Sequence, residues 1–164
     1  MASESTTFKL ANNGQAFTLE LDTPLIREVR KELDIDLVAS DMSGEAKAAS
    51  DIATLVDVLW ILCREQAEKN GISADVFGRG IKGDSWEAAV LALRRAIAFF
   101  SPSSSRSIRL AQIAAEERLQ RAGAAAALAK MTDEKAMQAI ENHITAEVDR
   151  AMNGLMTPAT VAKN

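Results

Sequence analysis

The sequence contains few of the residues on which most enzyme sites depend. Its 164 residues include one histidine, one cysteine and no tyrosine, and only 4% of them are aromatic. Acid–base, nucleophilic and zinc-dependent catalysis mostly use histidine or cysteine in clusters. No second histidine or cysteine lies within helical reach of His143, and the lone Cys63 cannot form an internal disulfide. We therefore expect no catalytic residue, no metal site and no cofactor, which leaves binding to another protein as the expected role.

Long hydrophobic runs are absent as well. The longest, from Val58 to Cys63, is far shorter than the roughly 20 residues that a membrane-spanning helix needs. The first ten residues, MASESTTFKL, lack the basic and apolar segments of a secretory signal. We therefore expect a protein that is neither inserted into a membrane nor exported, and that acts in the cytoplasm.

The residues that are present predict a chain that folds around an aliphatic core. Hydrophobic residues make up 48% of the sequence and charged residues 26%, a balance typical of globular proteins. Near the N-terminus, apolar and polar residues alternate at Thr7–Leu10 and Ala16–Leu21, on either side of Asn12-Asn13-Gly14. This pattern predicts a β-hairpin. Because two strands alone are only marginally stable, the hairpin is expected to pack on helices.

Three helices are predicted between the hairpin and residue 101. They run from Thr23, as the N-cap before Pro24, to Leu33, from Ser50 to the helix-ending Asn70-Gly71, and from Asp84, as N-cap, to Phe100. The second is the most apolar and is expected to bury Cys63 at the centre of the core. Residues 34–49 show no clear period and are expected to form a loop or a frayed turn. Ser73 is expected to cap a short turn, and the glycines from Gly78 to Gly83 to mark a connector.

A low-complexity stretch at Ser101-Pro102-Ser103-Ser104-Ser105 predicts a boundary. On this basis residues 1–101 form a core domain of hairpin plus helices, and residues 102–164 form an Ala-rich helical extension with a loose tail. The extension is expected to contain one long helix from Arg106 to Lys130 and a last helix capped by Thr132. The predicted fold class is mainly α with a short N-terminal β-hairpin (α+β), in which a helical core is followed by a C-terminal helical extension.

Three weaker signals for chemistry have simpler explanations. His143 lies next to the apolar stripe of the last predicted helix, where a solvated histidine is the common case. Asp34, Asp36 and Asp41 could collect a hard cation, but they lack the central glycine and terminal glutamate of a calcium loop, which favours a solvated acidic loop. Gly78-Arg79-Gly80 lacks the Gly-Lys-Ser/Thr ending of a phosphate-binding loop.

Charge is distributed unevenly along the chain. Residues 79–121 contain eight basic and four acidic residues, a net charge of +4, and because the whole chain carries −4 the remainder carries −8. Such a division is more typical of pairing with copies of the same chain or with a charged protein than of nucleic-acid binding. No aromatic residue stands among the basic residues after Ser101 to stack on bases. We therefore expect no nucleic-acid partner. A homo-oligomer is compatible with this division of charge and is kept as an alternative.

The chain resembles a known family over roughly residues 6 to 101. The segments that carry the resemblance are the hairpin, the Pro24–Leu33 helix running into Asp34-Ile35-Asp36-Leu37, the apolar Leu59–Arg64 segment, the Gly71–Phe77 run, and Asp84–Ala89 leading to Leu91 and Phe99-Phe100. This order is similar to that of the tail assembly chaperones of long-tailed (siphovirus-type) bacteriophages and prophages. The Ala-rich part after Pro102 has no counterpart in the resemblance.

The resemblance implies a function and its partners. It implies that the protein keeps the long, helical tape measure protein soluble in the cytoplasm of the bacterial host while the tail tube assembles, with the major tail tube protein as a further partner. On that hypothesis the protein-binding residues are Ile108, Ile113, Leu119, Ile140, Ile144, Val148 and Met152. The simpler interpretation is that these apolar side chains fold back on the core. The alternative function is a structural virion component of the tail or head–tail connector, which acts through helix-mediated subunit contacts.

Overall fold

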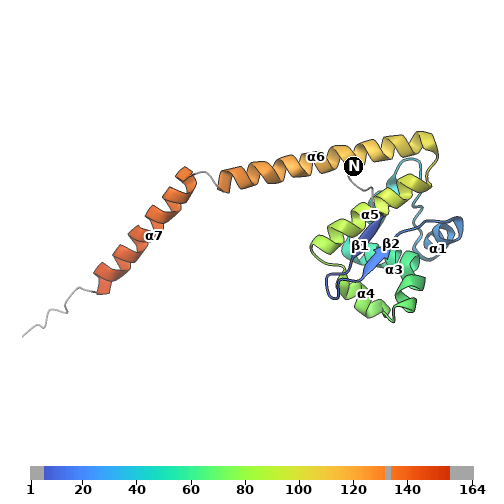
Figure 1. Cartoon of the computed structure of the whole chain (residues 1–164), viewed down its shortest axis with the longest axis horizontal. Coiled ribbons are helices and arrows are strands. Elements are labelled where there is room, and N and C mark those ends of the chain that lie inside the picture. Colours follow the sequence, from blue (N-terminus) through green and yellow to red (C-terminus); the bar gives the residue numbers. More distant parts are fainter. Residues whose placement is uncertain (1–5, 132–133, 156–164) are drawn as a thin grey trace, which may run out of the picture. The chain divides into compact units, whose positions relative to one another are not determined.

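The computed structural model describes residues 6–131 and 134–155 of the chain (Figure 1). Within these ranges there are seven helices and one two-stranded antiparallel hairpin. The predicted class, mainly α with a short N-terminal hairpin, is therefore confirmed. The chain divides into two compact units, Met1–Ala115 and Glu116–Asn164, and each is described by itself.

The hairpin forms where the alternating pattern predicts it. β1 (Thr7–Lys9) pairs with β2 (Ala16–Thr18), with Phe8 opposite Phe17. Both phenylalanines are buried, their ring centroids lie 5.8 Å apart, and each ring meets Phe77 edge-on. One face of the hairpin thus belongs to the core, which gives this short sheet the support that two strands lack.

Side chains from two helices close the outer edges of the hairpin. The Gln66 amide donates from Nε2 to the Thr18 carbonyl at 2.7 Å and accepts at Oε1 from the Thr18 N–H at 3.1 Å. On the other strand, Ser85 Oγ donates to the Lys9 carbonyl at 2.5 Å. The Gln66 amide therefore takes the place that a peptide group of a third strand would occupy.

Five helices follow the hairpin in the first unit. They are α1 (Thr23–Leu33), α2 (Ser43–Ala48), α3 (Ile52–Lys69), α4 (Ala74–Gly80) and α5 (Asp84–Phe100). Asp22 caps α1 and Asp51 caps α3 through carboxylates that accept backbone N–H bonds, and Gly83 precedes α5 without a side-chain cap. The three long helices are as predicted. The expected caps Thr23 and Asp84, and the expected first residue of the second helix, Ser50, each stand one residue from the observed cap. Aspartate is among the strongest N-caps, which explains the choice of Asp22 over Thr23.

Two stretches that were not predicted to be helical are helices. Residues 43–48 form α2, so the expected loop is wrong there, and Gly78 and Gly80 lie inside α4. A Cβ on Gly44 would overlap the Asp36 carbonyl, and a Cβ on Gly80 would lie 2.8 Å from the Leu10 Cβ. Gly44 permits close packing of α2 against the Asp36 backbone, and Gly80 permits close packing of α4 against the Leu10 and Asn12 side chains. From the sequence pattern alone, these glycines are expected to interrupt helices. The expected cap of α4 is confirmed, because the Ser73 hydroxyl accepts from the Val76 N–H.

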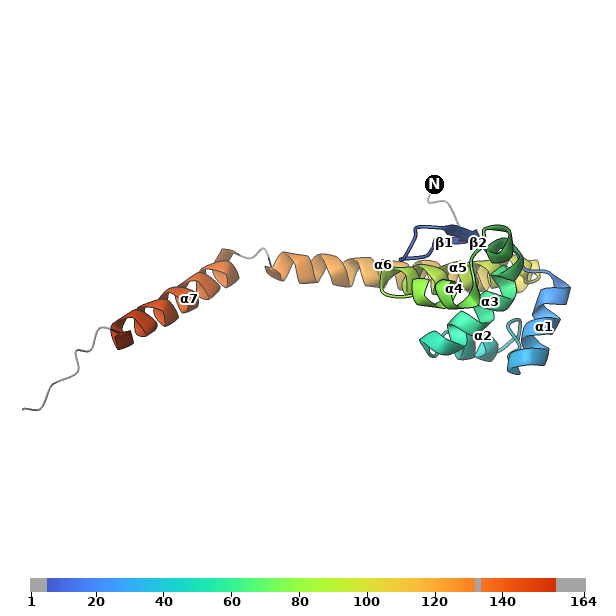
Figure 2. The same ribbon diagram turned by 90° about the horizontal axis from the view of Figure 1, so that it is seen from below.

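α3 lies at the centre of the first unit. Figure 2 shows the hairpin on one side of α3 and α5, and α1 with α2 on the opposite side. Leu55, Leu59 and Cys63 of α3 are fully buried, as are Leu93 and Ile97 of α5. The predicted burial of Cys63 in an aliphatic core is therefore confirmed.

α6 (Ser103–Met131) and α7 (Glu134–Leu155) complete the described chain. The two units divide between Ala115 and Glu116, inside α6, which is later than the boundary expected between residues 101 and 102. The serines of the expected linker form the first turn of α6, and the Pro102 carbonyl accepts from the Arg106 N–H at 2.8 Å. Serine suits a helix start as well as a linker, so composition alone could not separate the two. Thr132, the expected cap of the last helix, lies outside the described residues.

Candidate protein-binding surface

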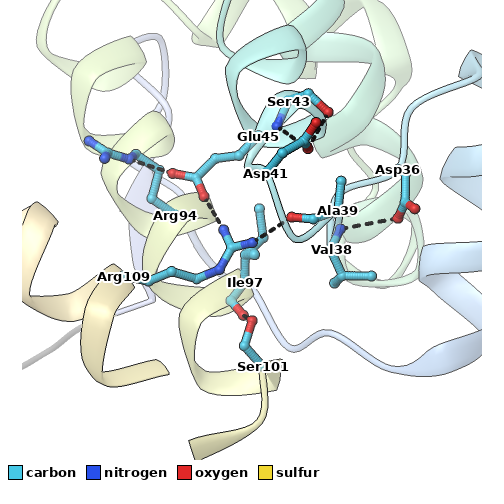
Figure 3. Close-up of polar contacts among 10 residues, drawn as sticks. All are labelled: Asp36, Val38, Ala39, Asp41, Ser43, Glu45, Arg94, Ile97, Ser101 and Arg109. Atoms are coloured by element: carbon cyan, nitrogen blue, oxygen red, sulfur yellow. Dashed lines mark hydrogen bonds and ion pairs between the residues drawn. The ribbon is translucent and has the colours of Figure 1, made fainter. Parts of the chain in front are cut away.

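A buried ion-pair cluster joins the start of α6 to the other helices of the first unit (Figure 3). One carboxylate oxygen of Glu45 accepts from Arg94 Nε at 2.6 Å, and the other accepts from Arg109 Nη1 at 2.6 Å. Arg109 Nη2 also donates to the Ala39 carbonyl at 2.9 Å. The side chains of Glu45 and Arg109 are only 10% and 6% exposed. Helices α2, α5 and α6, which are far apart in sequence, therefore meet at one carboxylate.

The turn between α5 and α6 is tied down as well. Ser101 Oγ donates to the Ile97 carbonyl at 2.8 Å, and Arg106 Nη2 donates to the Phe99 carbonyl at 2.8 Å. One turn beyond Arg109, Ile113 is buried at 4% exposure. Two of the basic residues counted from 79 to 121, Arg94 and Arg109, are thus engaged by Glu45. The cluster positions the start of α6 on the core.

The acidic residues after α1 have structural partners. Asp36 accepts from the Arg30 guanidinium at 2.5 Å, and this hydrogen bond lowers the pKa of the Asp36 carboxyl. Asp41 accepts from both the hydroxyl and the N–H of Ser43, which lowers its pKa. Asp34 is the C-cap of α1, in a left-handed conformation. Within residues 6–131 and 134–155, no group of three or more His, Cys, Asp or Glu side chains is placed to hold a metal ion.

The lone cysteine and the lone histidine differ in their surroundings. Burial raises the pKa of the Cys63 thiol to about 12, so the thiol stays protonated at neutral pH. Because the thiolate is the nucleophile, Cys63 acts here as an apolar core residue. His143, on α7, is exposed.

Four of the seven predicted protein-binding residues are more than half exposed. Ile108 and Leu119 of α6 are 60% and 73% exposed, and Ile144 and Val148 of α7 are 57% and 52% exposed. Ile113 differs, because it is buried within the first unit and is not open to a partner in this structure. The side chains of Ile140 and Met152 lie outside the part of the chain that the structure describes in atomic detail.

Other exposed apolar side chains were not among the predicted residues. Leu128 of α6 is 62% exposed, and Phe99 and Phe100 at the end of α5 are 36% and 38% exposed. The two phenylalanines line a cavity of about 490 Å³ together with Thr6, Leu19, Glu20, Leu21 and Ala96. Leu128 stands in an alanine run, so it has no large apolar neighbours at helical spacing that would mark it as part of a stripe. Phe99 and Phe100 belong to a strongly apolar helix, so the sequence pattern favours placing them in the core.

No helix among the described residues is both long enough and apolar enough to cross a lipid bilayer. Comparison of the chain with protein-family models, with curated proteins and with solved structures gives no match. The large exposed apolar side chains of α6 and α7 form the candidate protein-binding surface among the described residues.

Proposed function

We propose that this chain is a tail assembly chaperone of a long-tailed bacteriophage or prophage. It binds the tape measure protein and keeps it soluble in the cytoplasm of the bacterial host while the tail tube assembles. The major tail tube protein is a further partner, and the work requires neither a cofactor nor a catalysed reaction. The observation that carries the proposal is the exposure of large apolar side chains on α6 and α7.

The placement of these side chains supports binding to a helix. Ile144 and Val148 are four residues apart, so they lie on the same face of α7. Neighbouring apolar side chains of this kind form the anchors by which an amphipathic helix packs on another helix or in a groove. A tape measure protein is itself long and helical, as the family resemblance implies, and therefore offers apolar faces that such anchors can cover.

Co-expression with a tape measure protein tests the proposal. We expect the tape measure protein to be mainly insoluble when it is expressed alone and mainly soluble with the wild-type chain. The double variant Ile144→Asp/Val148→Asp should lose most of this rescue, because charged side chains cannot cover an apolar face. The soluble fraction after centrifugation, measured by quantitative gel analysis, reports the result.

A matched control uses apolar residues that are exposed elsewhere. Ile52 and Val76, in the first unit, are 48% and 41% exposed, and the double variant Ile52→Asp/Val76→Asp should rescue as well as the wild type. A wild-type chain that leaves the tape measure protein insoluble would contradict the proposal. Stoichiometric amounts of the chain in purified virus particles would instead assign it to the tail structure.

A further inference from the structure

We infer that α7 selects a partner helix whose apolar stripe is bordered by lysine or arginine, and that Glu141 and Glu147 make this selection. The inference rests on the proposed function for the existence of a helical partner. It adds the charge pattern which that partner has to carry.

Apolar residues recur along the sequence of α7. Met137, Ile140, Ile144, Val148 and Met152 follow one another at intervals of three or four residues. On a helix with about 3.6 residues per turn, this spacing keeps them on one side. Ile144 and Val148 are exposed, so this part of the stripe is open to a partner.

Acidic residues stand on both sides of the Ile144–Val148 pair. A helix rotates by about 100° per residue, which places Glu141 roughly 40° to one side of the pair and Glu147 roughly 80° to the other. Both are exposed. Arg150 is the one Lys or Arg between residues 141 and 150, and it lies roughly 140° away, toward the back of the helix. The borders of this part of the stripe are therefore acidic.

Charge complementarity then separates two kinds of partner. A second copy of α7 would bring acidic borders against acidic borders, and such like-charge contacts disfavour the pairing. A helix with basic borders would instead place a cation opposite each carboxylate. Exposed charge pairs add little affinity one by one, but they determine which partner is accepted and how the binding depends on salt.

Binding of two synthetic helical peptides to the full-length protein tests the inference. Both peptides carry the same leucine stripe, and the border positions are lysine in one and glutamate in the other. Fluorescence anisotropy should show that the wild-type chain binds the lysine-bordered peptide about 10-fold more tightly at low salt, with a ratio that shrinks as salt is added. The double variant Glu141→Lys/Glu147→Lys should reverse the preference.

The matched control makes the same change of charge on a different helix. Glu65 and Glu68 of α3 are exposed, and Glu65→Lys/Glu68→Lys should keep the wild-type preference for the lysine-bordered peptide. Three results would overturn the inference: equal binding of the two peptides, binding of neither, or a reversal in the α3 control as well. Self-association of the wild-type chain that is abolished by Glu141→Lys/Glu147→Lys would assign the face to a second copy and also overturn it.

Failure of the proposed function would be seen differently. If the peptide preference is found but the tape measure protein stays insoluble, the chaperone proposal fails and the basic-bordered partner is another protein. If Glu141→Lys/Glu147→Lys rescues the tape measure protein as well as the wild type and the peptides bind equally, the charge inference fails alone.

Discussion

Two isoleucines, one from each unit of this chain, have opposite surroundings. Ile97 in the first unit is fully buried, whereas Ile144 in the second is 57% exposed. Both lie on amphipathic helices. In the first unit the hairpin and the neighbouring helices cover the apolar faces, while in α7 the described part of the stripe faces solvent. The difference distinguishes the buried side chains that stabilise the first unit from the exposed apolar side chains on α6 and α7, which are the proposed binding residues.

Truncation of one large apolar side chain in each unit should give the largest difference in stability between the two units. Phe77 is fully buried and contacts Phe8, Phe17 and Trp60, so Phe77→Ala should lower the free energy of unfolding by about 4 kcal/mol. Leu119 is mostly exposed, and Leu119→Ala should change that free energy by less than about 0.5 kcal/mol. Urea denaturation followed by circular dichroism measures both. Similar losses would show that Leu119 is covered in solution.

Removal of the carboxylate that joins three helices should have the next largest effect. Glu45→Ala leaves the buried Arg109 without its anion, and we expect a loss of about 3 kcal/mol in the free energy of unfolding. The double variant Glu45→Leu/Arg109→Leu removes the carboxylate and one of its cations and should recover most of the loss. Thermal and urea denaturation are the measurements. An unchanged stability of Glu45→Ala would mean that the cluster does not hold the start of α6.

Two fragments test whether the first unit ends at residue 115 or at residue 101. A fragment of residues 1–115 keeps Arg109 and Ile113, whereas a fragment of residues 1–101 loses both. Burial of one isoleucine side chain contributes about 2 kcal/mol, so the shorter fragment should be less stable than the longer one by at least roughly that amount. Urea denaturation monitored by tryptophan fluorescence suits this test, because Trp60 and Trp86 are present in both fragments. Equal stability would place the functional division at residue 101.

The smallest effect concerns the buried thiol. Its pKa rises from near 9 in the unfolded chain to about 12 in the folded protein, so between these values the unfolded chain loses the thiol proton first. Stability should therefore fall as the pH rises from 9 to 12, by about 1 kcal/mol between pH 9 and pH 10. The variant Cys63→Ala should lack this component, and the absence of tyrosine removes a common source of interference. In the native wild type, iodoacetamide should not label Cys63 at pH 8.

Much of the first unit could be predicted from periodicity alone. The hairpin, α1, α3 and α5 follow from apolar residues at intervals of two or of three to four. α2 could not be found this way, because six residues are too few for a period, and its position depends on the close approach of Gly44 to Asp36. The cluster around Glu45 joins residues far apart in sequence, so no local pattern reveals it.

The candidate surface was only partly predictable for a related reason. A stripe shows which side chains share a face, but burial depends on what lies opposite that face. Ile108 and Ile113 belong to the same predicted edge of α6, yet five residues turn the helix by roughly 140° from one to the other. Ile113, one turn beyond Arg109, is therefore buried, while Ile108 faces solvent.

The Gln66 amide also limits aggregation of the protein through its strand edge in a concentrated solution. An open strand edge is a template on which further chains can add, one strand at a time, into a growing fibril. At Thr18 a side chain that carries one donor and one acceptor already occupies this template. Glutamate lacks the donor and asparagine lacks the reach, so even these close replacements would reopen the edge. A single amide group thus protects the hairpin against polymerisation at Thr18.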